Sequence, residues 1–350
     1  MRIAVMGAGG VGGYFGAKLA KAGNDVAFVA RGRHLTAMRE RGLVVRSALG
    51  DLAIERPDIP LGSHIPLGSH IPLGSHIPLG SHIPLGSHIP LGWHIPLGST
   101  SFTDDPASLA PADVVFFAVK LWDTESAAAA IRPLLANGGV VVPFQNGVES
   151  IERIGAVVGD DRVMGGVAYI AATIGEPGVI VHTGTMARLR FGPVQTNQQP
   201  VAEALHAACK AAGIDAELSA DIRRALWEKF AFLASFAGVT SAARQPMGVV
   251  RGDPDLRATL EAAIREAWAV ARAKGIELAD DFVAQQMKFA DGLPAEMKSS
   301  MLNDLTAGNR LEAPWLGGAV ARMGSAARVA TPVSSTLYAA LKPYCDGARR

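Results

Sequence analysis

Along the first 150 residues, apolar and polar positions follow the order strand, turn, helix. Residues 2–6 are a short apolar run, a glycine cluster follows, and residues 14–21 have the spacing of a helix that ends before Gly23. A strand over 25–30 and a helix over 34–41 repeat the same order. The chain therefore opens with two consecutive strand–helix units.

The alternation continues further along the chain. The pattern predicts a hairpin over 43–46 and 52–55, an apolar strand over 113–120, an alanine-rich helix over 124–135 and a buried strand over 139–143. Strands that alternate with helices in this way build a parallel, doubly wound sheet. The fold class is therefore α/β, with an N-terminal domain of the Rossmann type.

The second half of the chain has a different pattern. Short β-like runs alternate with glycine over 166–192, as expected of strands that extend or close the sheet, and long amphipathic helices follow Pro200. We therefore expect the Rossmann domain to cover residues 1–195 and an all-helical C-terminal domain to cover residues 196–350.

Charge and composition exclude several classes of protein. The 33 basic and 32 acidic residues leave a formal charge of +1, without the basic excess of a nucleic-acid-binding protein. Two cysteines provide neither a disulfide framework nor a metal site of the CxxC type. The densest apolar run, 114–119, is too short to span a bilayer, and no targeting segment precedes the first strand. We expect a cytoplasmic protein that binds no nucleic acid, metal or membrane.

The loop after the first strand carries a GxGxxG motif. Its residues are Gly7, Ala8, Gly9, Gly10, Val11 and Gly12. The motif lies directly after a strand and directly before a helix, which is the context that indicates dinucleotide binding. The first glycine permits a tight turn, the second lets the backbone approach a pyrophosphate, and the third allows the helix to pack on the strand. The helix N-terminus adds free N–H groups and a partial positive charge.

The end of the second strand indicates which dinucleotide binds. An acidic residue at this place would bond the unmodified ribose of NADH, but the chain has Arg31 there and Arg33 two residues later. A guanidinium pairs well with the 2′-phosphate of NADPH. NADP(H) is therefore the expected cofactor, and the alternative is a solvated pair of arginines on a loop.

Further along, a series of short motifs stands in a characteristic order. They are Val119-Lys120, Gln145-Asn146-Gly147, His182 with Gly184, Trp227-x-Lys229, Ser299-Ser300-Met301-Leu302-x-Asp304, Glu312 and Thr331-Pro332. With this series the chain resembles the ketopantoate reductase (2-dehydropantoate 2-reductase) family. The resemblance implies a Rossmann domain and a helical domain with the active site between them. It also implies hydride transfer from NADPH to the keto carbon of a 2-oxo acid.

The resemblance further implies roles for individual residues. Lys229 matches the catalytic acid of the family, and Asn146 matches a residue near the nicotinamide and the substrate. Lys120 and Glu312 match positions that contact the cofactor, and Ser300 matches one that contacts the substrate.

Physical chemistry supports Lys229 independently, although less sharply. Hydride delivery to a carbonyl leaves charge on oxygen, so a cationic donor both stabilises that charge and supplies the proton. Lys229 lies in a mostly apolar helix, where an inward-facing ammonium is costly unless an anion meets it. The alternative is a lysine that reaches water along the helix surface, and without the resemblance this alternative is favoured. Asn146 has a similar alternative as an ordinary turn residue.

The match fails at the residues that would hold the substrate. The family typically has asparagines where this chain has Leu233, Ala237 and Met247, whereas Thr240, near the same helix face, is available for a substrate contact. An unpaired substrate group costs about 1–3 kcal/mol. The sequence therefore predicts a pocket that is more apolar than usual in the family.

Residues 59–99 contain a hexapeptide repeat, IPLGSH, in six consecutive units, the last with Trp93 in place of serine, and the start of a seventh. Its six histidines lack the spacing of metal ligands, and six units are too few for a stable β-helix. An extended partner-binding segment is a third interpretation. We favour a flexible surface loop, because each doubling of loop length costs only about 0.6 kcal/mol.

Taken as a whole, the sequence predicts an NADPH-dependent enzyme that reduces 2-dehydropantoate (ketopantoate) to pantoate in pantothenate biosynthesis. Two alternatives stay open. One is a family relative that reduces a different, more apolar 2-oxo acid, and the other is a non-catalytic NADPH-binding protein. Helical second domains of this type often pair, which suggests a homodimer.

Overall fold

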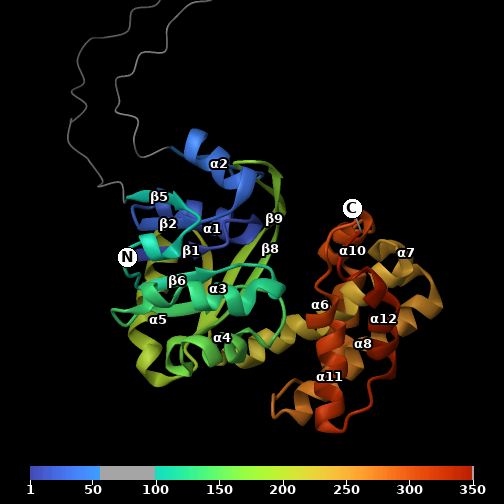
Figure 1. Ribbon diagram of the computed structural model, residues 1–350. Helices are drawn as coiled ribbons and strands as arrows, with labels where there is room; N and C mark the ends of the chain where they lie inside the picture. The colour runs from blue at the N-terminus through green and yellow to red at the C-terminus, as the bar shows by residue number, and fades with distance from the viewer. Residues whose placement is uncertain (56–98, 349–350) are drawn as a thin grey trace, which may run out of the picture.

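The computed structural model describes residues 1–55 and 99–348. Figure 1 shows two parts side by side, an α/β part that holds the N-terminus and a helical part that holds the C-terminus. The repeat, except for Ser99, lies outside the described residues, so the surface-loop interpretation stays a prediction. Among the described helices, none is long and apolar enough to cross a membrane.

The first sheet is parallel and runs in the order β5-β2-β1-β6-β7. Its strands are β1 (Arg2–Met6), β2 (Asp25–Val29), β5 (Thr100–Thr103), β6 (Val114–Phe117) and β7 (Val140–Pro143). The side chains of β6 and β7 are buried throughout, as expected of a sheet that is covered on both faces. This confirms the predicted Rossmann-type domain.

Four described helices, three between these strands and one after β7, complete the layered arrangement. They are α1 (Gly10–Lys21), α2 (Gly32–Arg41), α3 (Thr124–Ala130) and α4 (Ser150–Val158). The single helix predicted over 124–135 was wrong in its second part, because α3 ends at Ala130 and a 3-10 turn, Arg132–Leu135, follows. Pro133 explains the break, since proline has no backbone N–H to continue the α-helix.

A second sheet packs against the opposite side of α1. Its strands are β3 (Leu43–Ser47), β4 (Leu52–Ile54), β8 (Gly165–Glu176), β9 (Val179–Gly192) and β10 (Asp215–Leu218). The predicted hairpin is present as β3 and β4, which pair antiparallel. The strands expected to extend the first sheet do not, because β8 and β9 pair with each other and β9 pairs with β3.

Glycines on α1 explain why this second sheet can form. A Cβ on Gly13 would lie 2.7 Å from the Ile180 side chain of β9, and a Cβ on Gly10 would lie 2.0 Å from the carbonyl oxygen of Ala172 in β8. The absence of side chains at these two positions therefore allows β8 and β9 to pack directly against the backbone of α1. It is covered by the first sheet on one side and by the second sheet on the other.

The change from sheets to helices comes later than residue 195. Helix α5 (Gln199–Ala211) belongs to the apolar core around α1, and β10 pairs with β9 in the second sheet. The helical part begins at α6 (Ile222–Ala243), which also contacts β8. Residues 199–218 thus pack with the α/β part, whereas the sequence pattern assigned them to the helical domain.

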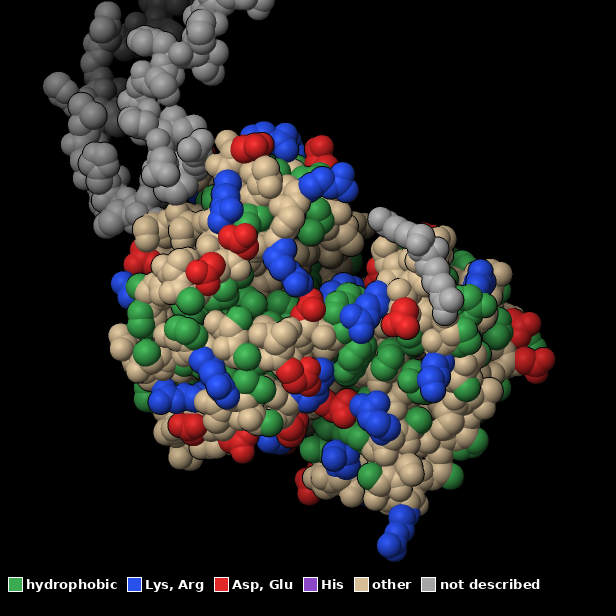
Figure 2. Space-filling model, in the orientation of Figure 1, with side chains coloured by type: hydrophobic (Ala, Val, Ile, Leu, Met, Phe, Trp, Pro, Cys, Tyr) green, Lys and Arg blue, Asp and Glu red, His purple; other side chains and the backbone are tan. Residues whose placement is uncertain are grey.

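The helical part consists of α6 and a group of helices packed around it. They are α7 (Met247–Gly252), α8 (Pro254–Ala273), α9 (Phe282–Asp291), α10 (Ser300–Thr306), α11 (Gly317–Ala327) and α12 (Pro332–Leu341). The residues of α6 from Phe230 to Ser241 are nearly all buried, so α6 is the central helix of this part. Figure 2 shows basic and acidic side chains interspersed over both parts of the surface.

Candidate active site

The glycine loop has the geometry that the motif predicts. Gly7 has φ +98°, and a Cβ at this residue would come within 2.9 Å of the backbone of Ala118. A Cβ on Gly12 would lie 2.2 Å from the Gly7 carbonyl oxygen. Gly7 and Gly12 therefore need to be glycine for the turn and for the packing of α1 on β1.

The same loop presents an open cradle at the start of α1. Gly9 is the N-cap, no side chain caps this helix end, and an added Cβ on Gly9 would meet no protein atom within 4 Å. The Gly13 N–H donates to the Gly9 carbonyl at 2.7 Å, so the N–H groups of Gly10, Val11 and Gly12 precede the first turn's hydrogen bond. Such a helix start fits a pyrophosphate.

Two further residues border this cradle. Ala8 is buried and its N–H donates to the Val29 carbonyl at 3.2 Å, which ties the loop to the end of β2. Arg31 follows β2, and its side chain is 76% exposed and forms an ion pair with Asp123 at 2.6 Å. The guanidinium thus lies at the edge of the sheet where the sequence analysis expects the 2′-phosphate.

Lys229 and Asn146 meet where the two parts of the protein join. Lys229 lies in the second turn of α6, and its Nζ donates to Asn146 Oδ1 at 2.9 Å and to the Ala168 carbonyl at 2.8 Å. Asn146 follows β7, and Ala168 lies in β8. Three segments that are far apart in sequence therefore converge on one ammonium group.

The surroundings change the acidity of this ammonium. Burial lowers the pKa of Lys229 to about 8, and the negative charge of Glu312 opposes that shift. Glu312 is itself buried and accepts a hydrogen bond from the Leu121 N–H at 3.1 Å. Lys229 is therefore poised to release a proton near neutral pH, which suits a general acid.

Lys120 links the end of the first sheet to the helical part. Its Nζ pairs with Asp304 of α10 at 3.2 Å and lies over the Trp122 ring at 5.6 Å. This ion pair joins the segment after β6 to α10. The hydrogen bond from the Leu121 N–H to Glu312 joins the same segment to the residues before α11. The predicted cofactor residues Lys120 and Glu312 thus lie at the same junction as Lys229.

The two predicted substrate residues differ in their surroundings. Ser300 is exposed at the start of α10, next to the Lys120–Asp304 pair. Thr240 is fully buried, and its hydroxyl already bonds the Phe236 carbonyl at 2.7 Å and Ser299 at 2.8 Å. The expected substrate contact at Thr240 is therefore contradicted by its packing, because the hydroxyl has no surface toward a ligand.

The three positions that lack asparagine are not equivalent. Leu233, one turn after Lys229 on α6, is half-buried, whereas Ala237 and Met247 are 1% and 0% exposed within the helical core. Only Leu233 of these three keeps an accessible surface on the Lys229 side of the helix. The apolar character predicted for the pocket therefore depends mainly on Leu233.

Some functional groups could not be found from the sequence. The Ala168 carbonyl is a backbone group, and any residue type in β8 would supply it. The hydrogen bonds that Ser299 makes with Thr240 and with the Leu302 N–H are tertiary and capping contacts, which its place in the series of motifs does not reveal. His182 is buried and bonded on both ring nitrogens, to Ser47 at 2.8 Å and to the Met186 carbonyl at 3.0 Å, as expected of a structural histidine.

A Rossmann-type sheet with an open glycine cradle, joined to a helical part at a buried lysine, defines a two-domain dinucleotide-dependent oxidoreductase. Comparison with known families is more specific. The profile "Ketopantoate reductase PanE/ApbA" matches residues 3–196, and "Ketopantoate reductase PanE/ApbA C terminal" matches residues 221–344. The chain belongs to the ketopantoate reductase family.

Individual relatives agree with this assignment. The "Uncharacterized oxidoreductase YkpB" of Bacillus subtilis is 26% identical over 344 residues, which are 98% of this chain and 99% of that protein. The 2-dehydropantoate 2-reductase of Halobacterium salinarum is 29% identical over 96% of each chain. The crystal structure of 2-dehydropantoate 2-reductase from Geobacter metallireducens has a TM-score of 0.80 and 27% identity, and the match covers 98% of this chain and 99% of that one.

Membership in this family makes the chain an NADP-dependent oxidoreductase that acts on 2-oxo acids. The predicted cofactor class and reaction class are thereby confirmed.

Proposed function

We propose that the protein reduces a 2-oxo acid, with ketopantoate as the first candidate, to the 2-hydroxy acid, and that Lys229 donates the proton. The observation that carries this proposal is the convergence of Asn146 Oδ1 and the Ala168 carbonyl on the Lys229 ammonium. An ammonium has three N–H donors, and these two acceptors use two of them. The third N–H is then available to a keto oxygen at the junction of the two parts.

The residues present fit the expected cofactor. The open cradle at Gly9, the N–H groups at the start of α1 and the exposed Arg31 guanidinium suit a pyrophosphate and a 2′-phosphate. When bound, NADPH supplies the hydride that reaches the keto carbon. Lys229 stabilises the charge that develops on the keto oxygen and transfers its proton there, so the product is an alcohol and the lysine becomes neutral. Solvent then returns a proton to Lys229.

Asn146 and Glu312 support this proton transfer in different ways. Asn146 accepts a hydrogen bond from the ammonium and so fixes its direction. The Glu312 carboxylate stabilises the charged form of Lys229 and keeps its pKa from falling below about 8. Lys229 is consequently protonated at neutral pH, and its pKa is low enough for the ammonium to release a proton to the substrate oxygen.

The pH dependence of turnover follows from the pKa of Lys229. Reduction requires the ammonium form, which predominates below a pKa of about 8. We expect kcat/KM for the oxo acid to be flat below this pH and to fall about tenfold per pH unit above it. Glu312→Gln removes the charge that raises this pKa, so the alkaline limb should move to lower pH. Steady-state rates from pH 6 to about 10 measure both effects, since these span the expected limb.

Glu203→Gln is the matched control for this pH experiment, because Glu203 is an exposed carboxylate on α5, a helix that packs on the core of the α/β part and carries none of the candidate site residues. The same profile in Glu312→Gln and wild type, or a limb that moves to higher pH, contradicts the proposed electrostatic coupling.

Leu233 favours a second candidate, a substrate with a more apolar side chain than ketopantoate. Half-buried on the Lys229 side of α6, Leu233 offers apolar contact where the family usually has an amide. An apolar 2-oxo acid such as phenylpyruvate would bury surface there, whereas a substrate hydroxyl would lose a hydrogen bond. The chemistry at Lys229 is the same for both substrates.

Leu233→Asn tests which substrate the pocket prefers. We expect the ratio of kcat/KM for ketopantoate over phenylpyruvate to rise about fivefold or more, because one hydrogen bond is worth about 1 kcal/mol. Leu256→Asn is the control, since Leu256 is a half-buried leucine of the same helical core on α8. An unchanged ratio of kcat/KM values in Leu233→Asn would show that Leu233 does not contact the substrate.

A further inference from the structure

A buried chain of hydrogen bonds connects α6 to the first turn of α10. Thr240 Oγ1 lies 2.8 Å from Ser299 Oγ and 2.7 Å from the Phe236 carbonyl oxygen. Ser299 is the N-cap of α10, and its Oγ accepts a hydrogen bond from the Leu302 N–H at 3.1 Å. Both hydroxyl residues are almost completely buried, with exposures of 0% for Thr240 and 2% for Ser299.

The direction of each hydrogen bond in this chain is determined. A carbonyl can only accept, so the single hydroxyl proton of Thr240 goes to Phe236. Thr240 Oγ1 must then accept from Ser299, whose own oxygen accepts from Leu302. The order is therefore Leu302 N–H to Ser299, Ser299 to Thr240, and Thr240 to Phe236. Loss of the Thr240 hydroxyl leaves the buried Ser299 hydroxyl without this acceptor. An unpaired buried donor destabilises the folded state, because it has lost its hydrogen bonds to water without gaining one in the protein.

The two helices joined in this way carry the groups that the reaction needs. Helix α6 carries Lys229 and Leu233, and α10 carries Ser300 next to the cap. One turn further, Asp304 pairs with Lys120 at 3.2 Å. The position of the first turn of α10 relative to α6 consequently sets how Ser300 and Asp304 stand with respect to Lys229.

We propose that Thr240 and Ser299 are positioning residues, which hold the first turn of α10 against α6 and so keep Ser300 and the Asp304–Lys120 ion pair in place at the junction that contains Lys229. Thr240 thus acts on substrate binding through Ser299 and α10, without touching the substrate. The inference rests on the proposed function for its catalytic consequence. Its structural basis is independent of which oxo acid the protein reduces.

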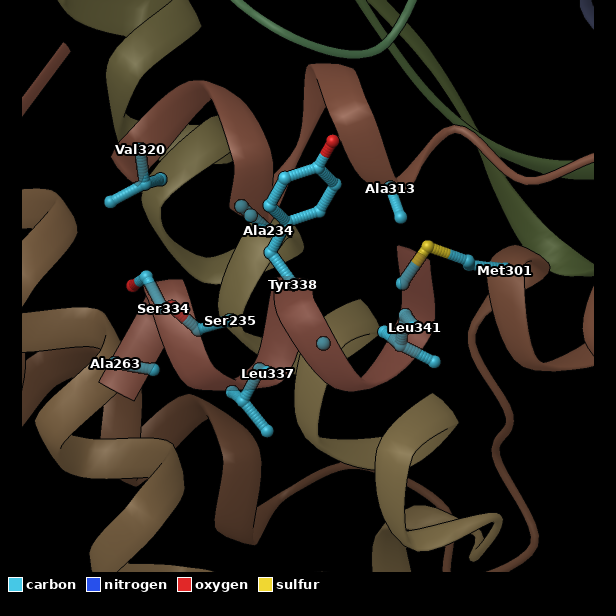
Figure 3. Close-up of a pocket in the computed structure, with 12 residues that line it drawn as sticks. Ala234, Ser235, Ala263, Met301, Ala313, Val320, Ser334, Leu337, Tyr338 and Leu341 are labelled. Atoms are coloured by element: carbon cyan, nitrogen blue, oxygen red, sulfur yellow. The ribbon is translucent and has the colours of Figure 1, made fainter. Parts of the chain in front are cut away.

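Ser235 provides an internal comparison on the same helix. It is buried like Thr240, with 4% exposure, and its hydroxyl donates to the Ala231 carbonyl at 2.8 Å. Figure 3 shows Ser235 beside Ser334, Leu337 and Ala263, on the side of α6 that faces α12. These residues line a small cavity of about 10 Å³. Ser235 therefore shares the burial and the local hydrogen bond of Thr240 but has no link to Ser299.

The test compares Thr240→Val, Thr240→Ser and Ser235→Ala in the full-length protein. Valine keeps the shape of threonine and removes the hydroxyl, so we expect KM for ketopantoate, or for phenylpyruvate if that is the better substrate, to rise about tenfold. We expect kcat to change less than about twofold and the alkaline limb of the pH profile to stay in place, since Lys229 is untouched. Thr240→Ser should restore the wild-type KM, and Ser235→Ala should leave it unchanged.

Two results would overturn the proposal. One is a KM that responds equally to Thr240→Val and Ser235→Ala, which would indicate general destabilisation of α6. The other is an unchanged KM in Thr240→Val.

Hydrogen exchange over residues 299–306 separates this proposal from the proposed function. It needs no turnover, and we expect faster exchange in Thr240→Val than in wild type or Ser235→Ala, with NADPH bound in each case. If wild type reduces no oxo acid, the proposed function fails. Exchange over α10 then still decides the link, because equal exchange in all three proteins would refute it.

Discussion

Lys229→Ala is expected to lower kcat/KM for the oxo acid by about 10²–10⁴-fold, the usual contribution of a positioned general acid. The ammonium is the group on which Asn146 and Ala168 converge, and its pKa of about 8 suits proton donation at neutral pH. The glycine cradle is untouched by this change. The Kd of NADPH, measured by fluorescence titration, should therefore stay within about threefold of wild type.

Lys274→Ala is the matched control for Lys229→Ala, because Lys274 is an exposed lysine that follows α8 in the same helical part. It should keep wild-type kinetics. If Lys229→Ala retains more than about a tenth of the wild-type kcat/KM while NADPH binding is normal, Lys229 is not the general acid.

Gly9→Val is expected to weaken NADPH binding about a hundredfold while the protein stays folded, a loss of roughly 2.7 kcal/mol in binding. A Cβ at Gly9 meets no protein atom within 4 Å, and its φ of −75° is accessible to any residue. The side chain would instead occupy the space into which the pyrophosphate must come. Replacing this N-cap glycine should lower the free energy of unfolding by about 1 kcal/mol at most.

Gly252→Val is the control for this cradle experiment, because a Cβ at Gly252, the last residue of α7, also meets no protein atom. It should leave the Kd of NADPH unchanged. Urea unfolding of both variants separates binding from folding. Tight NADPH binding by a folded Gly9→Val protein would show that the cofactor does not approach the backbone at Gly9.

Much of the α/β part could be predicted because its signals are local. Local sequence patterns specify the apolar runs of β1, β2, β6 and β7 and the glycines of the loop. Periodicity and spacing therefore predict these elements directly. The second sheet was not predicted, because its central contact, the pairing of β9 with β3, joins residues more than 130 positions apart in the chain. Nothing in the local pattern of residues 166–192 distinguishes an extension of the first sheet from a sheet on the far side of α1.

The candidate site divides in the same way. Lys229, Asn146, Lys120 and Glu312 were predicted from the family resemblance, and the structure brings their side chains or their neighbours to one junction. Thr240 shows the limit of helical periodicity, since counting along α6 places it near the Lys229 face but cannot reveal that α10 covers it. That covering depends on where the N-cap of α10 packs, which is a tertiary contact between residues 59 positions apart.

The most direct test of the central claim is the reaction of the wild-type protein itself. NADPH is mixed with the full-length protein and either ketopantoate or phenylpyruvate, and both the NADPH consumed and the 2-hydroxy acid formed are quantified. The account predicts one equivalent of 2-hydroxy acid for each NADPH oxidised with at least one of the two acids, and a rate that falls above pH about 8. Tight NADPH binding without any hydroxy acid from either substrate would contradict it.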